Sequence, residues 1–78
     1  MKVRVVVYGK PGCHLCEDAT VAVARICGDL GIGWHELDIT GEPDLWAKWA
    51  EYVPVIVVDG AVHDWFRVNE ERLRAALG

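Results

Sequence analysis

The sequence lacks an apolar run long enough to cross a membrane. Its longest apolar stretches, Val5–Tyr8 and Val53–Val58, are far shorter than the ~20 residues that a membrane-spanning helix requires. The stretch that follows Lys2 and Arg4 is also too short for the apolar segment of a secretory signal, and no small-residue cleavage site comes after it. We therefore expect a cytoplasmic protein that has no membrane partner.

An excess of positive charge is also missing. Eight Lys and Arg residues stand against twelve Asp and Glu residues, the formal net charge is −4, and the basic residues are scattered along the chain. A protein that binds DNA or RNA needs clustered basic residues, because these neutralise the phosphates that it contacts. The charge pattern therefore excludes nucleic acid as an expected partner.

Cysteine is scarce, and its odd count does not suit a disulfide scaffold. The chain has 78 residues, of which three are cysteines, four are tryptophans and 53% are hydrophobic. This length is too short for a second domain, whereas the apolar content suffices for one core. In a reducing compartment, a few cysteines indicate redox, catalytic or metal chemistry. We expect one domain over residues 1–78 that folds alone as a monomer.

Hydrophobic periodicity predicts the element order βαβαββα. The predicted strands cover residues 2–8, 34–39, 55–58 and 61–65. Between the last two strands, Asp59-Gly60 is a strong signal for the tight turn of a hairpin. The last pair of strands is therefore expected to be antiparallel.

Three helices are predicted between and after these strands. The first runs from about residue 13 to residue 30, with a short helix after Pro43 and a last helix capped by Asn69. We expect most of the tryptophans to pack in the core. The apolar stripe of the first helix is predicted at Leu15, Ala19, Ala22, Ile26 and Leu30.

The motif that points to chemistry is Cys13-His14-Leu15-Cys16, at the junction of the first strand and its helix. In this context a Cys-x-x-Cys spacing is typical of a redox pair. Unpaired N–H groups at the helix start stabilise a thiolate at Cys13, and Lys10 adds positive charge nearby. Cys16 lies one turn further along the same face, within reach of a disulfide. We expect His14 to face solvent and to tune the thiolate.

Two other interpretations of the cysteines stay open. Cys13 and Cys16 are a candidate zinc or copper(I) site if His14, His35 or His63 supplies a further ligand. Alternatively, both cysteines are inert small side chains, and the chain is an adaptor without redox activity.

The third cysteine, Cys27, is predicted to be a buried side chain at the edge of the apolar stripe. It lies on the same predicted helix as Cys16, ~16 Å further along the helix axis. Two cysteines that form a disulfide have Cα atoms within ~7 Å of each other. Cys27 is therefore not expected to form a disulfide with the redox pair.

The pair Val53-Pro54 precedes the third predicted strand. Proline is tolerated at a strand start, since no ladder N–H is needed there. If the bond between the two residues is cis, the turn leaves the backbone N–H and C=O of Val53 free to pair with an extended substrate. This predicts a substrate-binding role for both residues.

These features together resemble the thioredoxin fold, and the short glutaredoxin-like proteins in particular, over essentially all 78 residues. The resemblance implies an α/β fold with a central mixed four-stranded sheet and helices on both faces. It also implies a thiol–disulfide oxidoreductase in which Cys13 is the nucleophile, Cys16 the resolving thiol and Pro54 the cis-proline that faces them. Its substrates would be protein disulfides or low-molecular-weight thiols, with glutathione or a reductase as electron donor and no bound cofactor.

The sequence differs from glutaredoxins proper at three places. Those proteins carry Cys-Pro-Tyr-Cys, Thr-Val-Pro, and a Gly-Gly pair followed by an acidic residue that holds glutathione. Trp65 and Phe66 stand here where the Gly-Gly turn is expected. These two side chains are predicted to change what can dock beside the cysteines.

Overall fold

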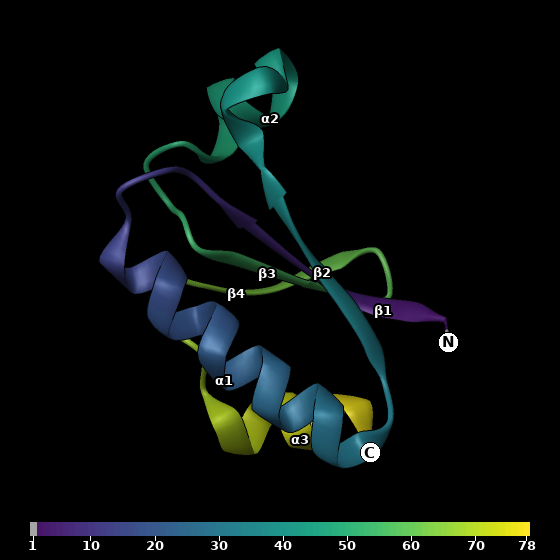
Figure 1. Ribbon diagram of the computed structural model, residues 1–78. Helices are drawn as coiled ribbons and strands as arrows, with labels where there is room; N and C mark the ends of the chain where they lie inside the picture. Colours follow the sequence, from purple (N-terminus) through teal and green to yellow (C-terminus); the bar gives the residue numbers. More distant parts are fainter. Residues whose placement is uncertain (1) are drawn as a thin grey trace.

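The computed structural model describes residues 2–78 and contains one mixed sheet and three α-helices (Figure 1). The predicted order βαβαββα is confirmed. The elements are β1 (Val3–Gly9), α1 (His14–Leu30), β2 (Gly33–Asp38), a 3-10 turn (Ile39–Gly41), α2 (Pro43–Trp49), β3 (Val55–Val58), β4 (Ala61–Trp65) and α3 (Glu70–Leu77).

The sheet has the strand order β2-β1-β3-β4. β1 runs parallel to β2 and antiparallel to β3, and β3 runs antiparallel to β4. The predicted hairpin turn is confirmed: Asp59 and Gly60 both have positive φ, at 51° and 85°, as the tight turns of twisted hairpins require. The sheet is therefore mixed, with β1 and β3 at its centre.

Helices α1 and α3 cover one face of the sheet (Figure 1). Val5 and Val7 of β1 pair in register with Val58 and Ile56 of β3. These four side chains form the sheet side of the main core. Two ion pairs, Arg25–Glu70 and Arg74–Asp29, each at 2.8 Å, connect α1 to α3. The buried residues of this core are Val5, Val7, Ala19, Val23, Ile26, Cys27, Ile56, Val58, Leu73 and Leu77.

A second, smaller cluster lies toward the carboxyl end of β1. Its buried members are Cys16, Ile39 and Val53, and Leu45 and Trp49 from α2 pack against it. Tyr8 and Leu37 also pack there, and they are register partners on the sheet face opposite the main core. The short helix α2 thus supports this end of the molecule.

The predicted apolar stripe of α1 is partly wrong. Leu15 and Leu30 are 39% and 40% exposed, whereas Val23 and Cys27 are fully buried. The helix is rotated about its axis relative to the prediction, because its buried face is centred on a stripe that includes two cysteines. Small sulfur side chains count as apolar there. The buried positions of α1 are Cys16, Ala19, Val23, Ile26 and Cys27.

The prediction that most tryptophans pack in the core is also wrong. Trp46 and Trp65 are 41% and 49% exposed, and Trp34 and Trp49 are half-buried. Trp46 belongs to α2, in which no residue is fully buried, and Trp65 ends an edge strand. Within residues 2–78, no helix is long and apolar enough to span a bilayer.

Candidate active site

Cys13 is the N-cap residue of α1. The chain leaves β1, turns through Gly12 in the left-handed region at φ 74°, and reaches Cys13 in an extended conformation. The backbone N–H of Cys16 donates a hydrogen bond to Cys13 Sγ at 3.1 Å. Sulfur thus occupies the position where a side-chain oxygen commonly caps a helix. The Cys16 N–H is one of the donors that a helix leaves unpaired in its first turn, and it is directed toward this sulfur.

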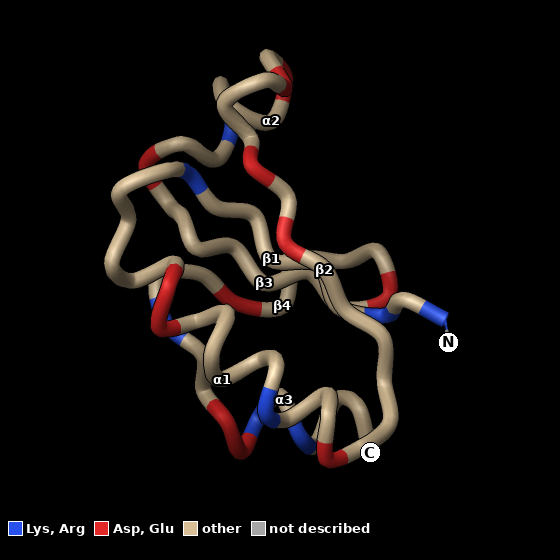
Figure 2. The backbone as a smooth tube through the Cα atoms, viewed as in Figure 1, with Lys and Arg blue, Asp and Glu red and all other residues tan. Residues whose placement is uncertain are grey.

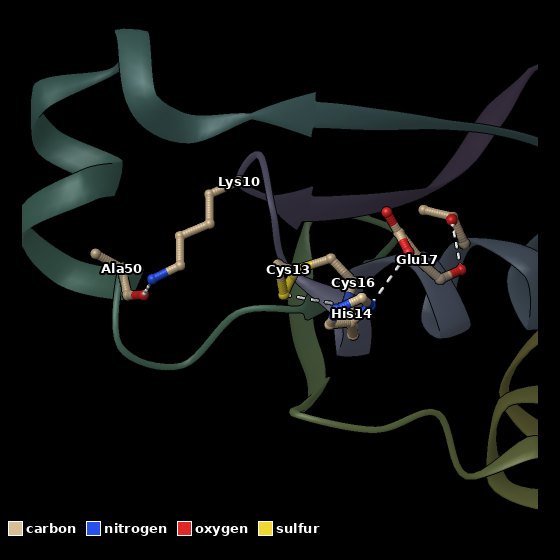
Figure 3. Close-up of a disulfide and its surroundings, with 7 residues drawn as sticks. Lys10, Cys13, His14, Cys16, Glu17 and Ala50 are labelled. Carbon is tan, nitrogen blue, oxygen red and sulfur yellow. Dashed lines mark hydrogen bonds and ion pairs between the residues drawn. A yellow bond between two sulfur atoms is a disulfide. The ribbon is translucent and has the colours of Figure 1, made fainter.

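Cys13 and Cys16 form a disulfide, with their Cα atoms 5.2 Å apart (Figure 3). The two sulfurs differ in accessibility: Cys13 is half-buried, whereas Cys16 is only 2% exposed. An external thiol or disulfide can therefore approach the sulfur of Cys13 more readily than that of Cys16. The helix geometry brings the predicted redox pair together.

The loop that carries Val53 and Pro54 lies against this disulfide. Val53 is 6% exposed and shares the smaller cluster with Cys16, and Cys13 packs against the same cluster. The peptide bond between Val53 and Pro54 is cis. The Pro54 carbonyl accepts a hydrogen bond from the Phe66 N–H at 2.8 Å, which joins the end of β4 to this loop. Cys13 and Val53 are 40 residues apart in the sequence, and the fold brings their two motifs together.

Two other predicted site residues make their contacts elsewhere. Lys10 extends to α2, where its Nζ donates to the Ala50 carbonyl at 3.2 Å and lies 5.7 Å from the centre of the Trp46 ring (Figure 3). The His14 side chain is 95% exposed, as expected, and its Nδ1 lies 3.6 Å from Glu17 Oε2. Neither side chain makes a hydrogen bond to the disulfide within the described residues.

A cavity of about 250 Å³ opens beside the disulfide, and three carboxylates border it. Glu17 comes from α1, whereas Glu36 and Asp38 come from β2. Asp38 accepts hydrogen bonds from the N–H and hydroxyl of Thr40, at 2.9 and 2.6 Å, and these hold the pKa of Asp38 below its ordinary value.

Glu36 and Asp38 were not predicted to be residues of this site. A signal for them exists in the element order. The carboxyl ends of parallel neighbouring strands lie at one edge of a sheet, and the cysteine loop follows the carboxyl end of the strand that pairs with theirs. Polar residues near the end of the second strand could therefore have been assigned to this site.

Cys27 is separate from the redox pair. It is fully buried in the main core, as predicted, and burial raises the pKa of its thiol. Its sulfur is free. A buried thiol with a raised pKa is a weak nucleophile, because little of it is ionised.

His35 and His63, two of the three histidines of the metal-site interpretation, do not lie at the cysteines, and the side chain of the third, His14, is 95% exposed. His35 is exposed on β2, and His63 occupies an irregular position of β4, where its Nε2 is buried and has no hydrogen-bond partner among residues 2–78. Across residues 2–78, no three side chains of His, Cys, Asp or Glu are grouped so that they could hold a metal ion.

Residues 4–78 match the family model named Glutaredoxin-like domain (DUF836). The chain belongs to this family. The glutaredoxin-like domain is 31% identical over 79 residues to the uncharacterized protein Rv0508 of Mycobacterium tuberculosis, covering 95% of this chain and 81% of that protein. The uncharacterized protein Mb0520 of Mycobacterium bovis matches to the same extent.

Solved structures show the same architecture. The glutaredoxin-like domain superposes on target protein XcR50 of X. campestris with a TM-score of 0.75 and 28% identity, covering 94% of this chain and 93% of that one. Protein Ne2328 of Nitrosomonas europaea gives a TM-score of 0.79 and 27% identity, with coverage of 100% and 95%. Fasciola hepatica thioredoxin superposes with a TM-score of 0.60 and 22% sequence identity, covering 94% of this chain and 75% of that one. The domain therefore shares the thioredoxin fold.

Proposed function

We propose that this glutaredoxin-like domain is a thiol–disulfide oxidoreductase that works by a dithiol mechanism. The observation that carries the proposal is the Cys13–Cys16 disulfide at the start of α1, with the outer sulfur capping the helix and the inner sulfur buried. The family and the fold support redox chemistry of this type.

The reaction has two exchange steps. The Cys13 thiolate attacks one sulfur of a substrate disulfide, forms a mixed disulfide with it and releases the other substrate sulfur as a thiolate. Cys16 then loses its proton and attacks Cys13 Sγ. The Cys13–Cys16 bond forms, and the second substrate thiolate leaves. The substrate gains two electrons, which the pair of cysteine thiols loses.

The surroundings of the cysteines suggest a role for each remaining site residue. Val53 and Pro54 would bind the backbone of an extended substrate beside Cys13, as their packing against the cysteine cluster supports. The exposed His14 and the Lys10 ammonium would contact substrate at the rim.

The substrates would be disulfides of proteins or of low-molecular-weight thiols, in the cytoplasm. Glutathione or a reductase would return the domain to its dithiol form, and the monomer would need no bound cofactor, nucleic acid or membrane. The exposure of the Phe66 side chain supports the proposal of a protein substrate. Its ring lies 6.1 Å from that of Tyr52, so two exposed aromatic residues flank the Val53–Pro54 loop.

Mass spectrometry of the protein after incubation with glutathione disulfide tests the proposal. The wild type is expected to end with an internal Cys13–Cys16 disulfide and no adduct. Cys16→Ser is expected to accumulate one glutathione adduct on Cys13, because the resolving step is lost, whereas Cys13→Ser is expected to form none. An adduct that stays on the wild type, or one that forms on Cys13→Ser, would overturn the assigned mechanism.

A further inference from the structure

Phe66 has a backbone conformation that is unusual for a residue with a side chain. Its φ is 68°, in the left-handed region, which a Cβ atom disfavours. The Arg67 N–H donates to the Trp65 carbonyl at 2.9 Å, so the chain makes a three-residue γ-turn with Phe66 at its centre. A γ-turn with positive φ is rare and strained. Strain of this kind persists where the surrounding structure fixes it, and it is concentrated at functional sites.

Two contacts hold this turn beside the Val53–Pro54 loop. The Phe66 N–H donates to the Pro54 carbonyl at 2.8 Å, and the Phe66 ring lies against that of Tyr52, with 6.1 Å between the ring centres. Tyr52 in turn meets Trp49 edge to face, at 6.0 Å. The position of Phe66 is therefore fixed from the side of the loop, although its side chain is 41% exposed.

Phe66 also lines a groove between α1 and the segment that follows β4. The groove has a volume of about 320 Å³. This is near the lower end of the range for small-molecule sites, so the groove suits one large side chain rather than a cofactor. Leu15, which stands between Cys13 and Cys16 in the sequence, is 39% exposed and lines the same groove. The other apolar lining residues are Ala19, Ala22 and Val68.

Charge does not select the occupant of this groove. Its charged lining residues are of both signs, Asp18, Arg67 and Glu70, and Glu70 is paired with Arg25 at 2.8 Å. Acidic and basic residues are also interspersed along α1 and α3 (Figure 2). The interaction that the groove offers is therefore burial of apolar surface.

We propose that Phe66 is a specificity-determining residue which, together with Leu15, binds a large apolar side chain next to the reactive cysteine of a polypeptide substrate. The inference rests on the proposed dithiol function and names the substrate that this function would take. While the substrate cysteine is joined to Cys13, the neighbouring side chain lies in the groove against the Phe66 ring. Because the turn already fixes Phe66, little of its conformational freedom is lost on binding.

The test compares three peptide disulfides as substrates of the fully reduced protein. Each is a symmetric disulfide of acetyl-Ser-X-Cys-X-Ser-amide, in which X is Leu, Gly or Asn. The protein reduces one peptide disulfide to two thiols as Cys13 and Cys16 form their own disulfide, and mass spectrometry after rapid acid quenching measures the oxidised fraction. Each rate constant is divided by that of dithiothreitol with the same peptide, which removes differences in the intrinsic reactivity of the disulfides.

The wild type is expected to reduce the Leu peptide about tenfold faster than the Gly peptide, because an apolar side chain leaves water. The Asn peptide, which is of similar size but polar, should react like the Gly peptide. Phe66→Gly removes the ring and suits a left-handed backbone, and it is expected to reduce the preference for Leu to about twofold or less. Leu15→Ala shortens the other exposed apolar side chain of the groove and should also reduce the preference.

Val62→Ala is the matched control. Val62 is as exposed as Phe66, at 41%, but it lies on β4 and does not line the groove. The preference for the Leu peptide should therefore stay in this variant. Thermal melting compares the folding of all variants.

Three results would overturn the proposal while leaving the dithiol function standing: no preference for Leu in the wild type, an equal preference for Asn, or a preference that survives both Phe66→Gly and Leu15→Ala. A preference lost in Trp65→Ala but kept in Phe66→Gly would assign it to the neighbouring ring and also overturn the proposal. So would a dimer in sedimentation that Phe66→Gly abolishes, since a second copy would then occupy the groove. Reduction that persists in Cys13→Ser would instead refute the dithiol function.

Discussion

The backbone N–H of Cys16 donates to the sulfur of Cys13 at 3.1 Å, so the two cysteines are joined by a helix cap as well as by a disulfide. The cap does not depend on the disulfide, because its donor is a backbone group at the helix end. In the reduced protein the same donor is available to a thiolate at Cys13. Cys16 is buried one turn inside the helix and has no equivalent position.

This difference predicts the order in which the two thiols react. Cys13 is expected to have the lower pKa, since helix-end donors stabilise its thiolate, whereas apolar surroundings disfavour charge on Cys16. Alkylation of the reduced protein with iodoacetamide over a range of pH, followed by peptide mass spectrometry, should show Cys13 modified at lower pH. Modification of Cys16 at the lower pH would mean that the nucleophile is misassigned.

Oxidation is expected to leave Cys27 reduced. Its side chain is fully buried in the main core, and burial raises its pKa, so it is poorly available for exchange. Mild oxidation followed by peptide mapping should find the Cys13–Cys16 bridge and one free thiol at Cys27. The variant Cys27→Ala serves as the control and should form the same bridge. A bridge that includes Cys27 would contradict the separation of the two clusters.

The main core predicts a contrast between two positions of α1. Ile26 is fully buried, whereas Val21, on the same helix, is 69% exposed. Ile26→Val is expected to lower the free energy of unfolding by about 0.5–1.5 kcal/mol, because one buried methylene is lost. Val21→Ala should change it by less than about 0.5 kcal/mol. Urea denaturation measures both, and equal effects would argue against the burial of Ile26 in the main core.

The ion pair between α1 and α3 predicts a pH dependence of stability. The hydrogen bond from Arg25 holds the pKa of Glu70 below its ordinary value. A lowered carboxyl pKa contributes stability that is present above the unfolded-state pKa and is lost as pH falls through the folded-state pKa.

Acidification from about pH 5 to about pH 3 should therefore lower Tm more in the wild type than in Glu70→Gln. The neighbouring Glu71, which is exposed on the same helix, provides the matched control. Glu71→Gln is expected to follow the wild type. Thermal melting at a series of pH values checks this. Identical dependences of Tm on pH for Glu70→Gln and Glu71→Gln would refute a role of the Arg25–Glu70 ion pair.

Local patterns in the sequence determined much of the fold. The strands at 55–58 and 61–65 lie on each side of Asp59-Gly60, and β-branched residues in both favour extended backbone. The conformation of the Asp59-Gly60 turn depends only on residues close to it in the sequence. Asn69 caps α3 as predicted, by accepting from the Arg72 N–H. The position of Cys13 at a helix start was likewise predictable, because strand and turn signals precede it.

Tertiary structure alone decided which distant residues meet. The Glu36 carboxylate and the Cys16 sulfur both border the position that a Cβ atom on Gly9 would take, because parallel pairing of β1 and β2 sets Glu36 opposite Val7. The exposure of Trp65 follows from its place on an edge strand. Sequence periodicity predicts which side chains share a face of one helix or strand. Contacts between elements depend on strand register and on the rotation of each helix about its axis. Both are determined by the packing of the whole core.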